Sequence, residues 1–404
     1  MTSERRNLRI AILGSRGIPH TYSGYEAFIG EIGPRLVQRG HDVLVYCRSS
    51  LFHDRPATYK GVRLVYRPGI ETKTMGTLTH TFVSMWDVIF RQMDVIFVVN
   101  VVNAFHCILP RLLGKNVAIN VDGLDWKRGK WGKLGKKYFY MNAKCVGTIC
   151  PKGVVTDAQE MRRIYIEEFA TPSVSIAYGA NIQSAENPEA VRLYGLEPGN
   201  YYLIASRLVP ENNADLIVDA FAKVRTSRKL AIAGGANYRS AFVDRVKASE
   251  DPRVTFLGHV AGADHIRELH CGAYAYIHGH SLGGTNPALL KALGYSNCVL
   301  ALDTPFNREV LQNYGILFDA DSENLAQKIQ NLEDNPQLVA QYRRIAPKRI
   351  VEAYSWEKIT DQYEELFQQL AAGQDPTKIH SSISQAELSL EQPELVDFVA
   401  SGRR

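Results

Sequence analysis

A glycine-rich segment in the last third of the chain has the residue types and spacing that bind phosphate. The apolar run 273–277 leads into the turn 283–287, Gly-Gly-Thr-Asn-Pro, and three leucines at helical spacing follow. A strand, a glycine turn and a helix N-terminus together present free backbone N–H groups to an anion. Pro287 suits the first position of a helix, and Thr285 or Asn286 can cap it. The segment therefore predicts an anion-binding loop, with a plain connecting turn as the alternative.

Two further polar groups follow apolar runs in the same half of the chain. Arg207 comes two residues after the run 201–205, and the polar stretch 303–309 follows the run 298–302. Ligands of open α/β sheets bind at the carboxyl ends of the strands, where such residues gather. A guanidinium there can hold a phosphate through two hydrogen bonds and stabilise a leaving group, or it can make a surface ion pair. We expect the stretch 303–309 to form a loop at this edge.

Two histidines, His278 and His280, come at the end of the run 273–277. Their spacing could suggest a metal site, but no cluster of carboxylates or thiols accompanies them. We therefore expect no metal and place both histidines in the polar lining of a cleft.

Short apolar runs alternate with amphipathic helical patterns, which is typical of an open, doubly wound parallel sheet. The alternation begins with a run at 8–13 and a helix over 24–39, and it starts again near residue 200 after a turn-rich connection. The sequence therefore predicts two Rossmann-like α/β domains facing a cleft. Strands are expected at 8–13, 43–46, 62–66, 95–99, 117–121, 146–149, 201–205, 229–233, 254–257, 273–277 and 298–302.

The predicted boundaries divide the chain into four parts. The first Rossmann-like domain spans 1–183 and the second spans 184–354. Residues 355–371 have the apolar stripe of a strongly amphipathic helix. The polar tail 372–404 has little apolar surface to order it.

The composition is that of an ordinary globular protein, with 45% hydrophobic and 22% charged residues and a net charge of +5. This charge permits contact with phosphates or an anionic membrane surface, but no base-reading element indicates nucleic acid. Six scattered cysteines without a CxxC pair favour free thiols in a reducing cytosol. No apolar stretch approaches the ~20 residues that span a bilayer. We expect a cytoplasmic protein with at most peripheral membrane contact.

A basic stretch over 127–137 alternates with aromatic and apolar residues. Such a stretch suits a helix that lies on an anionic membrane surface. A solvated helix face beside an ordinary core stripe explains the same pattern equally well. The stretch contains Lys127, Arg128, Lys130, Lys133, Lys136 and Lys137.

Four segments together resemble the motifs of one enzyme family. They are GSRGIPHTYSGYEAF (14–28), NVDGLDWKRGKWGKL (120–134), SRLVPENNADLIVDAF (206–221), and HGHSLGGTNPALLKAL (278–293) with DTPFNREV (303–310). Over residues 8–370 the chain resembles family 4 retaining glycosyltransferases of the GT-B fold. More narrowly, it is similar to the bacterial branch that contains rhamnosyltransferases of capsule and cell-wall polysaccharide assembly.

This resemblance implies that a nucleotide-sugar donor binds the second domain, that the acceptor binds the first, and that the C-terminal helix crosses back. Basic side chains and helix dipoles would stabilise the leaving nucleotide diphosphate without a metal or another cofactor. The catalytic candidates are Arg207 and Asp122. The donor-binding candidates are Gly17, Asn212, Gly283, Gly284, Thr285, Asn286, Lys291 and Glu309, and the acceptor-binding candidates are Arg16, Glu26 and Asp125.

Three donor-side positions depart from the family pattern. Asn212 stands where the family often has a lysine, so one positive charge is missing. Gly283 and Lys291 stand where the family has a pair of glutamates eight positions apart. The first glutamate normally lies by the donor sugar, and a deoxy sugar presents different hydroxyls there. The second normally accepts hydrogen bonds from ribose, which an ammonium cannot do, although Lys291 could contact a diphosphate.

The first-domain candidates have structural alternatives. Asp122 stands where many family members have a histidine in the sugar pocket, and a carboxylate there can bind a hydroxyl of donor or acceptor. A cap or turn aspartate beside Gly123 is the alternative. Glu26 lies close to the turn at 14–17 and can face either the acceptor or solvent.

These features predict transfer of a deoxyhexose, L-rhamnose from dTDP-L-rhamnose, to a glycan or lipid-linked glycan with retained configuration. A nucleotide-sugar epimerase of the same fold is one alternative, and it would need no acceptor. A catalytically silent binding protein is another, which Gly283 and Lys291 keep open. A dinucleotide oxidoreductase is the weakest, because the turn at 14–17 lacks the three-glycine spacing.

Overall fold

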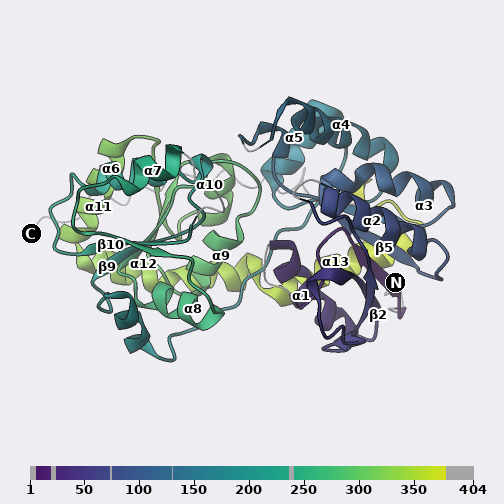
Figure 1. Ribbon diagram of the computed structural model, residues 1–404, viewed down its shortest axis with the longest axis horizontal. Helices are drawn as coiled ribbons and strands as arrows, with labels where there is room; N and C mark the ends of the chain where they lie inside the picture. Colours follow the sequence, from purple (N-terminus) through teal and green to yellow (C-terminus); the bar gives the residue numbers. More distant parts are fainter. Residues whose placement is uncertain (1–5, 20–23, 73–74, 130, 236–240, 379–404) are drawn as a thin grey trace, which may run out of the picture.

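Two separate, mainly parallel β-sheets organise the chain, and each carries its own helices (Figure 1). The computed structural model describes residues 6–19, 24–72, 75–129, 131–235 and 241–378. In Figure 1 the first domain lies on the right and the second on the left. This arrangement confirms the predicted fold class of two α/β domains.

The first sheet has eight strands in the order β3-β4-β2-β1-β5-β6-β7-β8, parallel except where β3 meets β4. Its strands are β1 (Arg9–Leu13), β2 (Asp42–Arg48), β3 (Thr58–Tyr59), β4 (Val62–Arg67), β5 (Val95–Val99), β6 (Val117–Val121), β7 (Val154–Thr156) and β8 (Val174–Ser175). Its helices are α1 (Gly24–Gln38), α2 (Met75–Val88), α3 (Ile108–Leu112), α4 (Lys133–Ile149) and α5 (Gln159–Phe169). The central strands β1, β5 and β6 are buried along almost their whole length, as expected for a sheet covered on both faces.

The second sheet has six parallel strands in the order β11-β10-β9-β12-β13-β14. They are β9 (Tyr201–Ala205), β10 (Lys229–Ala233), β11 (Val254–Gly258), β12 (Ala275–His278), β13 (Val299–Leu302) and β14 (Ile316–Phe318). The helices are α6 (Ala214–Phe221), α7 (Ala241–Lys247), α8 (Ala263–Gly272), α9 (Pro287–Gly294), α10 (Pro305–Leu311), α11 (Ser322–Asp334) and α12 (Pro336–Arg349). Crossovers run outward from β9 in both directions, so β9 and β12 flank the switch point at which such folds bind ligands.

The C-terminal helix α13 (Trp356–Ala371) returns to the first domain, as predicted (Figure 1). Its Tyr363 ring lies 5.1 Å from Phe28 of α1 and 5.3 Å from Phe97 of β5, between ring centroids. Arg39, just after α1, donates hydrogen bonds to Asp361 at 2.6 Å and to Glu364 at 2.8 Å. An aromatic core and a rim of ion pairs thus join the two ends of the chain.

One predicted strand is wrong. The apolar run 146–149 is the last turn of α4, and the strand of this region is β7, five residues further on. Val146 and Ile149 continue the buried stripe that Phe139 and Ala143 begin on α4. The spacing of that stripe is helical, and the run read alone looked like a strand because it is short and apolar.

The stretch 303–309 is also not the loop that the sequence predicted. It forms most of α10. The Thr304 hydroxyl caps the start of this helix by accepting a hydrogen bond from the Asn307 N–H at 3.1 Å. Pro305 occupies the first helical position, where its missing N–H costs nothing. A threonine cap followed by proline was the signal for a helix start in the sequence.

All six cysteines are free, as predicted. Within the described residues, no helix is both long and apolar enough to cross a membrane. Most of the predicted polar tail, from residue 379, and Lys130 of the basic stretch lie outside the described residues.

Candidate active site

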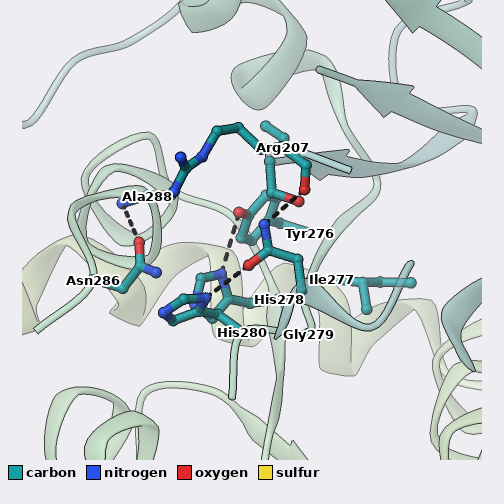
Figure 2. A pocket seen from close by; sticks show the side chains of 11 residues that line it. Arg207, Tyr276, Ile277, His278, Gly279, His280, Asn286 and Ala288 are labelled. Atoms are coloured by element: carbon teal, nitrogen blue, oxygen red, sulfur yellow. Dashed lines mark hydrogen bonds between the residues drawn. The ribbon is translucent and has the colours of Figure 1, made fainter. Parts of the chain in front are cut away.

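A cavity of about 150 Å³ opens at the carboxyl ends of the strands in the second sheet. Its walls come from the segment after β9, the end of β12 and the first turn of α9. Figure 2 shows the side chains of Arg207, His278, His280 and Asn286 around it. The structure therefore brings together three predicted residues, Arg207, Asn212 and Asn286, with the two histidines of the predicted cleft lining.

Asn212 positions both Arg207 and His280. Its amide Nδ2 donates to the Arg207 carbonyl at 2.7 Å, which leaves its Oδ1 to accept from His280 Nδ1 at 2.7 Å. The proton of a neutral His280 therefore sits on Nδ1, and Nε2 is an acceptor. Burial, followed by the charge of Arg128, lowers the pKa of His280 to about 4, so the ring is neutral at neutral pH.

His278 is a deeply buried polar group of the cavity. Only 3% of the residue is exposed, and burial lowers its pKa to about 3. Its Nδ1 lies 3.3 Å from the Tyr276 hydroxyl, whereas its Nε2 has no hydrogen-bond partner among the described residues. A buried unpaired nitrogen costs free energy, so a ligand that hydrogen-bonds to it regains that cost on binding.

The N-terminus of α9 and the Arg207 guanidinium supply the positive character of the cavity. Asn286 caps α9, since its Oδ1 accepts from the Ala288 N–H at 2.9 Å. The first turn of a helix favours an anion through its unsatisfied N–H groups. Arg207 is exposed, and no carboxylate among the described residues forms an ion pair with it. The site can therefore bind a phosphate without first breaking an existing pair.

The glycine turn that precedes α9 packs against the first domain. Gly283 has a φ of +114°, which favours glycine, and a Cβ at Gly284 would overlap the Asp157 carboxylate. The Thr285 hydroxyl donates to the Asp157 carbonyl. Gly284 and Thr285, predicted as donor ligands, thus form an interdomain contact.

Asp122, at the end of β6, lies on the first-domain side with two tyrosines. The Tyr178 hydroxyl donates to its Oδ2 at 2.7 Å, and the Tyr25 hydroxyl donates to its Oδ1. Burial raises the pKa of Asp122, and the two tyrosine hydrogen bonds oppose that rise. The half-buried carboxylate is thus oriented by hydroxyl donors, and its remaining lone pairs can accept from a ligand hydroxyl.

A second carboxyl, Asp157, completes this group and was not predicted. It directly follows β7, is buried, and its Oδ1 has no hydrogen-bond partner in the described part of the chain. Burial, followed by the charge of Asp122, raises the pKa of Asp157 well above its usual range. Asp157 was missed because the sequence analysis placed this strand at 146–149. A polar residue directly after the true strand was the signal that could have revealed it.

Arg128 reaches the same cleft from the basic stretch. Its guanidinium lies 3.6 Å from where a Cβ at Gly283 would be, and 3.5 Å from Asp125. Burial alone would lower the pKa of Arg128, but Asp125 and Asp122 hold it above its usual value. The predicted membrane stretch therefore contributes one cation to the interdomain cleft, where sequence reasoning did not place it.

Two regions of the chain match known domain families. Residues 192–349 match the family described as glycosyl transferases group 1. Residues 91–181 match a family described as a domain of unknown function. No curated protein matches the chain.

Solved structures of similar shape share low sequence identity with this chain. Sucrose-phosphate synthase from Thermosynechococcus elongatus is 16% identical, covers 91% of this chain with 100% of its own, and has a TM-score of 0.74. HepE from Anabaena in complex with UDP-glucose is 15% identical, with coverages of 89% and 99% and a TM-score of 0.68. The catalytic domain of starch synthase IV from Arabidopsis thaliana, bound to ADP and acarbose, is 13% identical, with coverages of 91% and 100% and a TM-score of 0.69.

The chain has the GT-B fold, and the domain over residues 192–349 matches the group 1 glycosyl transferase family. That domain contains the cavity, Arg207 and the α9 N-terminus. The region of the unknown-function match contains Asp122, Arg128 and Asp157. Each matched region therefore supplies one side of the cleft.

Lys291 of the group 1 domain is exposed on α9 and does not line the cavity. Loss of solvation beside the surrounding protein lowers the pKa of its ammonium, and the charge of Glu31 on α1 opposes that shift. Lys291 thus lies within the electrostatic reach of Glu31 in the first domain, but outside the cavity.

Glu309 has a structural position that differs from the predicted donor contact. One carboxylate oxygen accepts from the Gln159 N–H at 2.8 Å and the other from the Glu160 N–H at 3.1 Å. Glu309 of α10 therefore caps α5 of the first domain, where its charge favours the helix N-terminus. Burial raises the pKa of this carboxyl, and these two N–H groups oppose the rise.

The predicted acceptor residues mainly shape the first-domain loops. Glu26 is buried and accepts from the Arg16 N–H at 2.8 Å, so it holds the turn at 14–17. Gly17, which was predicted to bind the donor, packs against β2 instead, because a Cβ there would lie 2.5 Å from Cys47 Sγ. Asp125 is buried and accepts from Trp131 Nε1 at 3.3 Å. Glu26 faces neither solvent nor the cavity of the second domain.

Proposed function

We propose that this protein is a glycosyltransferase that takes a sugar from a nucleotide-diphosphate donor and passes it to an acceptor hydroxyl. The cavity at Arg207 carries this proposal, because it combines a guanidinium that pairs with no carboxylate of the described residues, a capped helix N-terminus and neutral imidazoles. Its position in a group 1 glycosyl transferase domain supports it. HepE, of the same fold, has been solved with UDP and with UDP-glucose, which supports a nucleotide-sugar ligand.

In the proposed reaction the bond between the sugar C1 and the leaving phosphate oxygen breaks on the face from which the acceptor attacks. The acceptor oxygen bonds to C1, and its proton passes to the leaving phosphate oxygen. Retention of configuration follows from this geometry. Arg207 and the α9 N–H groups stabilise the charge that develops on the diphosphate. The proposed chemistry needs no resident metal or other cofactor, since cationic groups supply this charge.

Arg128 is the proposed second cation of this site. Asn212 has no charge and so cannot neutralise a phosphate. Its amide is already hydrogen-bonded to the Arg207 carbonyl and to His280. Arg128 lies by Gly283 at the glycine turn and lowers the pKa of His280, so its charge is felt inside the cavity. A guanidinium from the first domain would thus complete the diphosphate site from across the cleft.

The donor proposed for this site is dTDP-L-rhamnose, and the acceptor a glycan or lipid-linked glycan of a cell-surface polysaccharide, used at the cytoplasmic face of the membrane. Resemblance to the rhamnosyltransferase branch supports this choice, and so does Gly283 in place of a glutamate beside the sugar. Asp122, oriented by Tyr25 and Tyr178, is the proposed ligand of a sugar or acceptor hydroxyl.

The test is a panel of donors followed by product analysis. Purified protein is heated with dTDP-L-rhamnose, UDP-glucose or GDP-mannose, and we expect the first to raise the melting temperature most, since a ligand of the folded state stabilises it. Incubation of the stabilising donor with lipid-linked glycan should then yield a glycosylated product of unchanged anomeric configuration by NMR. Conversion of the donor without acceptor would indicate an epimerase, and binding without turnover a silent protein.

A further inference from the structure

Most of the large apolar side chains exposed on the described chain lie on one flank of the first domain. They belong to α2, α3 and α4 or directly follow α2 and α3, whereas the second sheet and its helices expose few. Phe90 is 75% exposed, Leu112 78% and Leu134 84%. This surface, called here the apolar flank, consists of Met75, Phe82, Trp86, Phe90, Ile108, Leu109, Leu112, Leu113, Leu134, Tyr140 and Met141.

The three helices are neighbours in space. The segment η2 (Val101–Cys107) leads into α3 and packs against both α2 and α4. Its His106 ring lies 6.1 Å from Phe82 of α2, and its Phe105 ring lies 6.0 Å from Tyr138 of α4. Figure 1 shows α2 and α3 together on this side of the first domain, with α4 above them. Exposed apolar patches of this kind on a soluble domain mark sites of interaction.

The charge around the apolar flank has one sign. Segments 101–115 and 131–152 contain seven lysines and arginines and no aspartate or glutamate. Along α4 the exposed residues alternate between apolar and basic, as Leu134, Lys137, Met141 and Lys144. The acidic residue of α2, Asp87, is paired with Arg91 at 2.8 Å and Arg67 at 2.6 Å.

We propose that the apolar flank docks on an anionic lipid surface. Exposed aromatic and leucine side chains beside lysines of α4 that form no ion pair with another described residue suit the boundary between acyl chains and acidic headgroups. Two copies of this chain would instead bring like charges together. The docking surface shares only the end of the predicted basic stretch, including Leu134 and Lys137, since Arg128 turns into the cleft and Trp126 is buried. Asp122 and Arg128 lie just before α4 in the chain, so docking would hold the cleft close to the membrane.

The first experiment measures sedimentation of the full chain with vesicles of phosphatidylcholine alone or mixed with phosphatidylglycerol. We expect binding to the mixed vesicles that weakens with salt, and little binding to the neutral ones. Lys137→Gln with Lys144→Gln should weaken binding roughly fivefold for each lysine removed. The matched control, Lys247→Gln with Lys348→Gln on the second domain, should bind as the wild type does.

The apolar contribution is tested separately with Trp86→Ser and Phe90→Ser, against Leu193→Ser on the second domain, where the leucine is 76% exposed. Only the first pair should lose binding. Trp86 fluorescence should shift to the blue on mixed vesicles, and Trp86→Phe should lose that shift. If the serine pair does not fold, Leu112→Ser with Leu113→Ser replaces it.

Three results would overturn the proposal. They are equal binding to neutral and acidic vesicles, equal loss in the second-domain controls, and a dimer in analytical ultracentrifugation that Trp86→Ser with Phe90→Ser dissociates. The last result would assign the flank to a second copy of the chain. None of these measurements depends on sugar transfer, so the docking surface and the proposed reaction can fail independently.

Discussion

The two sides of the cleft carry different chemical groups. The second-domain side has Arg207, the α9 N-terminus and two neutral imidazoles. The first-domain side has two carboxyls of raised pKa, Asp122 and Asp157, with tyrosine hydroxyls around Asp122. The difference indicates a division of tasks, in which one side binds the diphosphate and the other binds hydroxyls. Arg128 is the exception, because it brings a cation from the acidic side toward the basic side.

The largest effect should come from removing the cation of the second-domain side. Arg207→Ala should lower kcat by at least about 100-fold, as loss of one stabilising donor does in other active sites. The melting temperature should stay unchanged, because Arg207 is exposed. Arg344→Ala, an exposed arginine on α12, is the control and should keep the wild-type rate. A near-normal kcat in Arg207→Ala would place the diphosphate elsewhere.

The contact between the two sides should be the next most sensitive. Gly284→Ala places a Cβ against the Asp157 carboxylate, so the turn or the domains must move. We expect a destabilisation of about 1–3 kcal/mol, typical of overpacking, seen as a lower melting temperature. A Cβ at Gly235 would meet nothing within 4 Å, so Gly235→Ala is the matched control. Equal melting of both variants would mean that the turn does not pack closely against Asp157.

Arg128 tests the difference between the two sides directly, because it belongs to the first domain but lies close to the cavity of the second. Arg128→Gln should lower kcat/KM about tenfold, since it removes one of two cations near the diphosphate. It should also raise the pKa of His280, which Arg128 now lowers. NMR titration of the imidazole measures this second effect without any substrate. An unchanged His280 pKa together with normal kcat/KM would leave Arg128 as a partner of Asp125 alone.

The second-domain side could be predicted from the sequence more fully than the first. Its groups depend on short-range patterns, since a strand, a glycine turn and a capped helix lie within about twenty residues of each other. Arg207 and Asn286 were found in this way and Asn212 through the family resemblance, and the structure brings the three together. Thr304 and Pro305 show that local signals for α10 were present as well.

The first-domain side depends on contacts between distant parts of the chain. Asp157 follows a strand of three residues, too short to stand out beside the apolar end of α4. Glu309 caps a helix of the other domain, a pairing of residues 150 positions apart that no local pattern reveals. In the sequence Arg128 is one of several cations of the basic stretch, and only the fold shows that it lies beside the glycine turn of the second domain. The roles of Asp157, Glu309 and Arg128 depend on their positions in space, and spacing along the chain does not give those positions.

The smallest expected effect concerns the pH dependence of the first-domain carboxyls. A carboxyl whose pKa is raised on folding stabilises the protein most at pH below its unfolded value, and this contribution is lost as pH rises through the folded pKa. Asp157 has such a raised pKa. Asp157→Asn should therefore melt higher than wild type near neutral pH, and the gain should shrink toward pH 4. Thermal melts of both proteins across this pH range measure the gain.

The buried histidines give the free energy of unfolding the opposite dependence on pH. The variant must therefore be compared with wild type at each pH. The pKa values of His278 and His280 are lowered to about 3 and about 4, so their contribution is lost as pH falls below the unfolded histidine value. Both proteins share this loss, and it cancels in the difference between their melting curves. Asp319→Asn, at an exposed position of the second domain, is the control variant. Parallel curves for Asp157→Asn and wild type would mean that Asp157 is ionised at little cost and that the cleft around it is open to water.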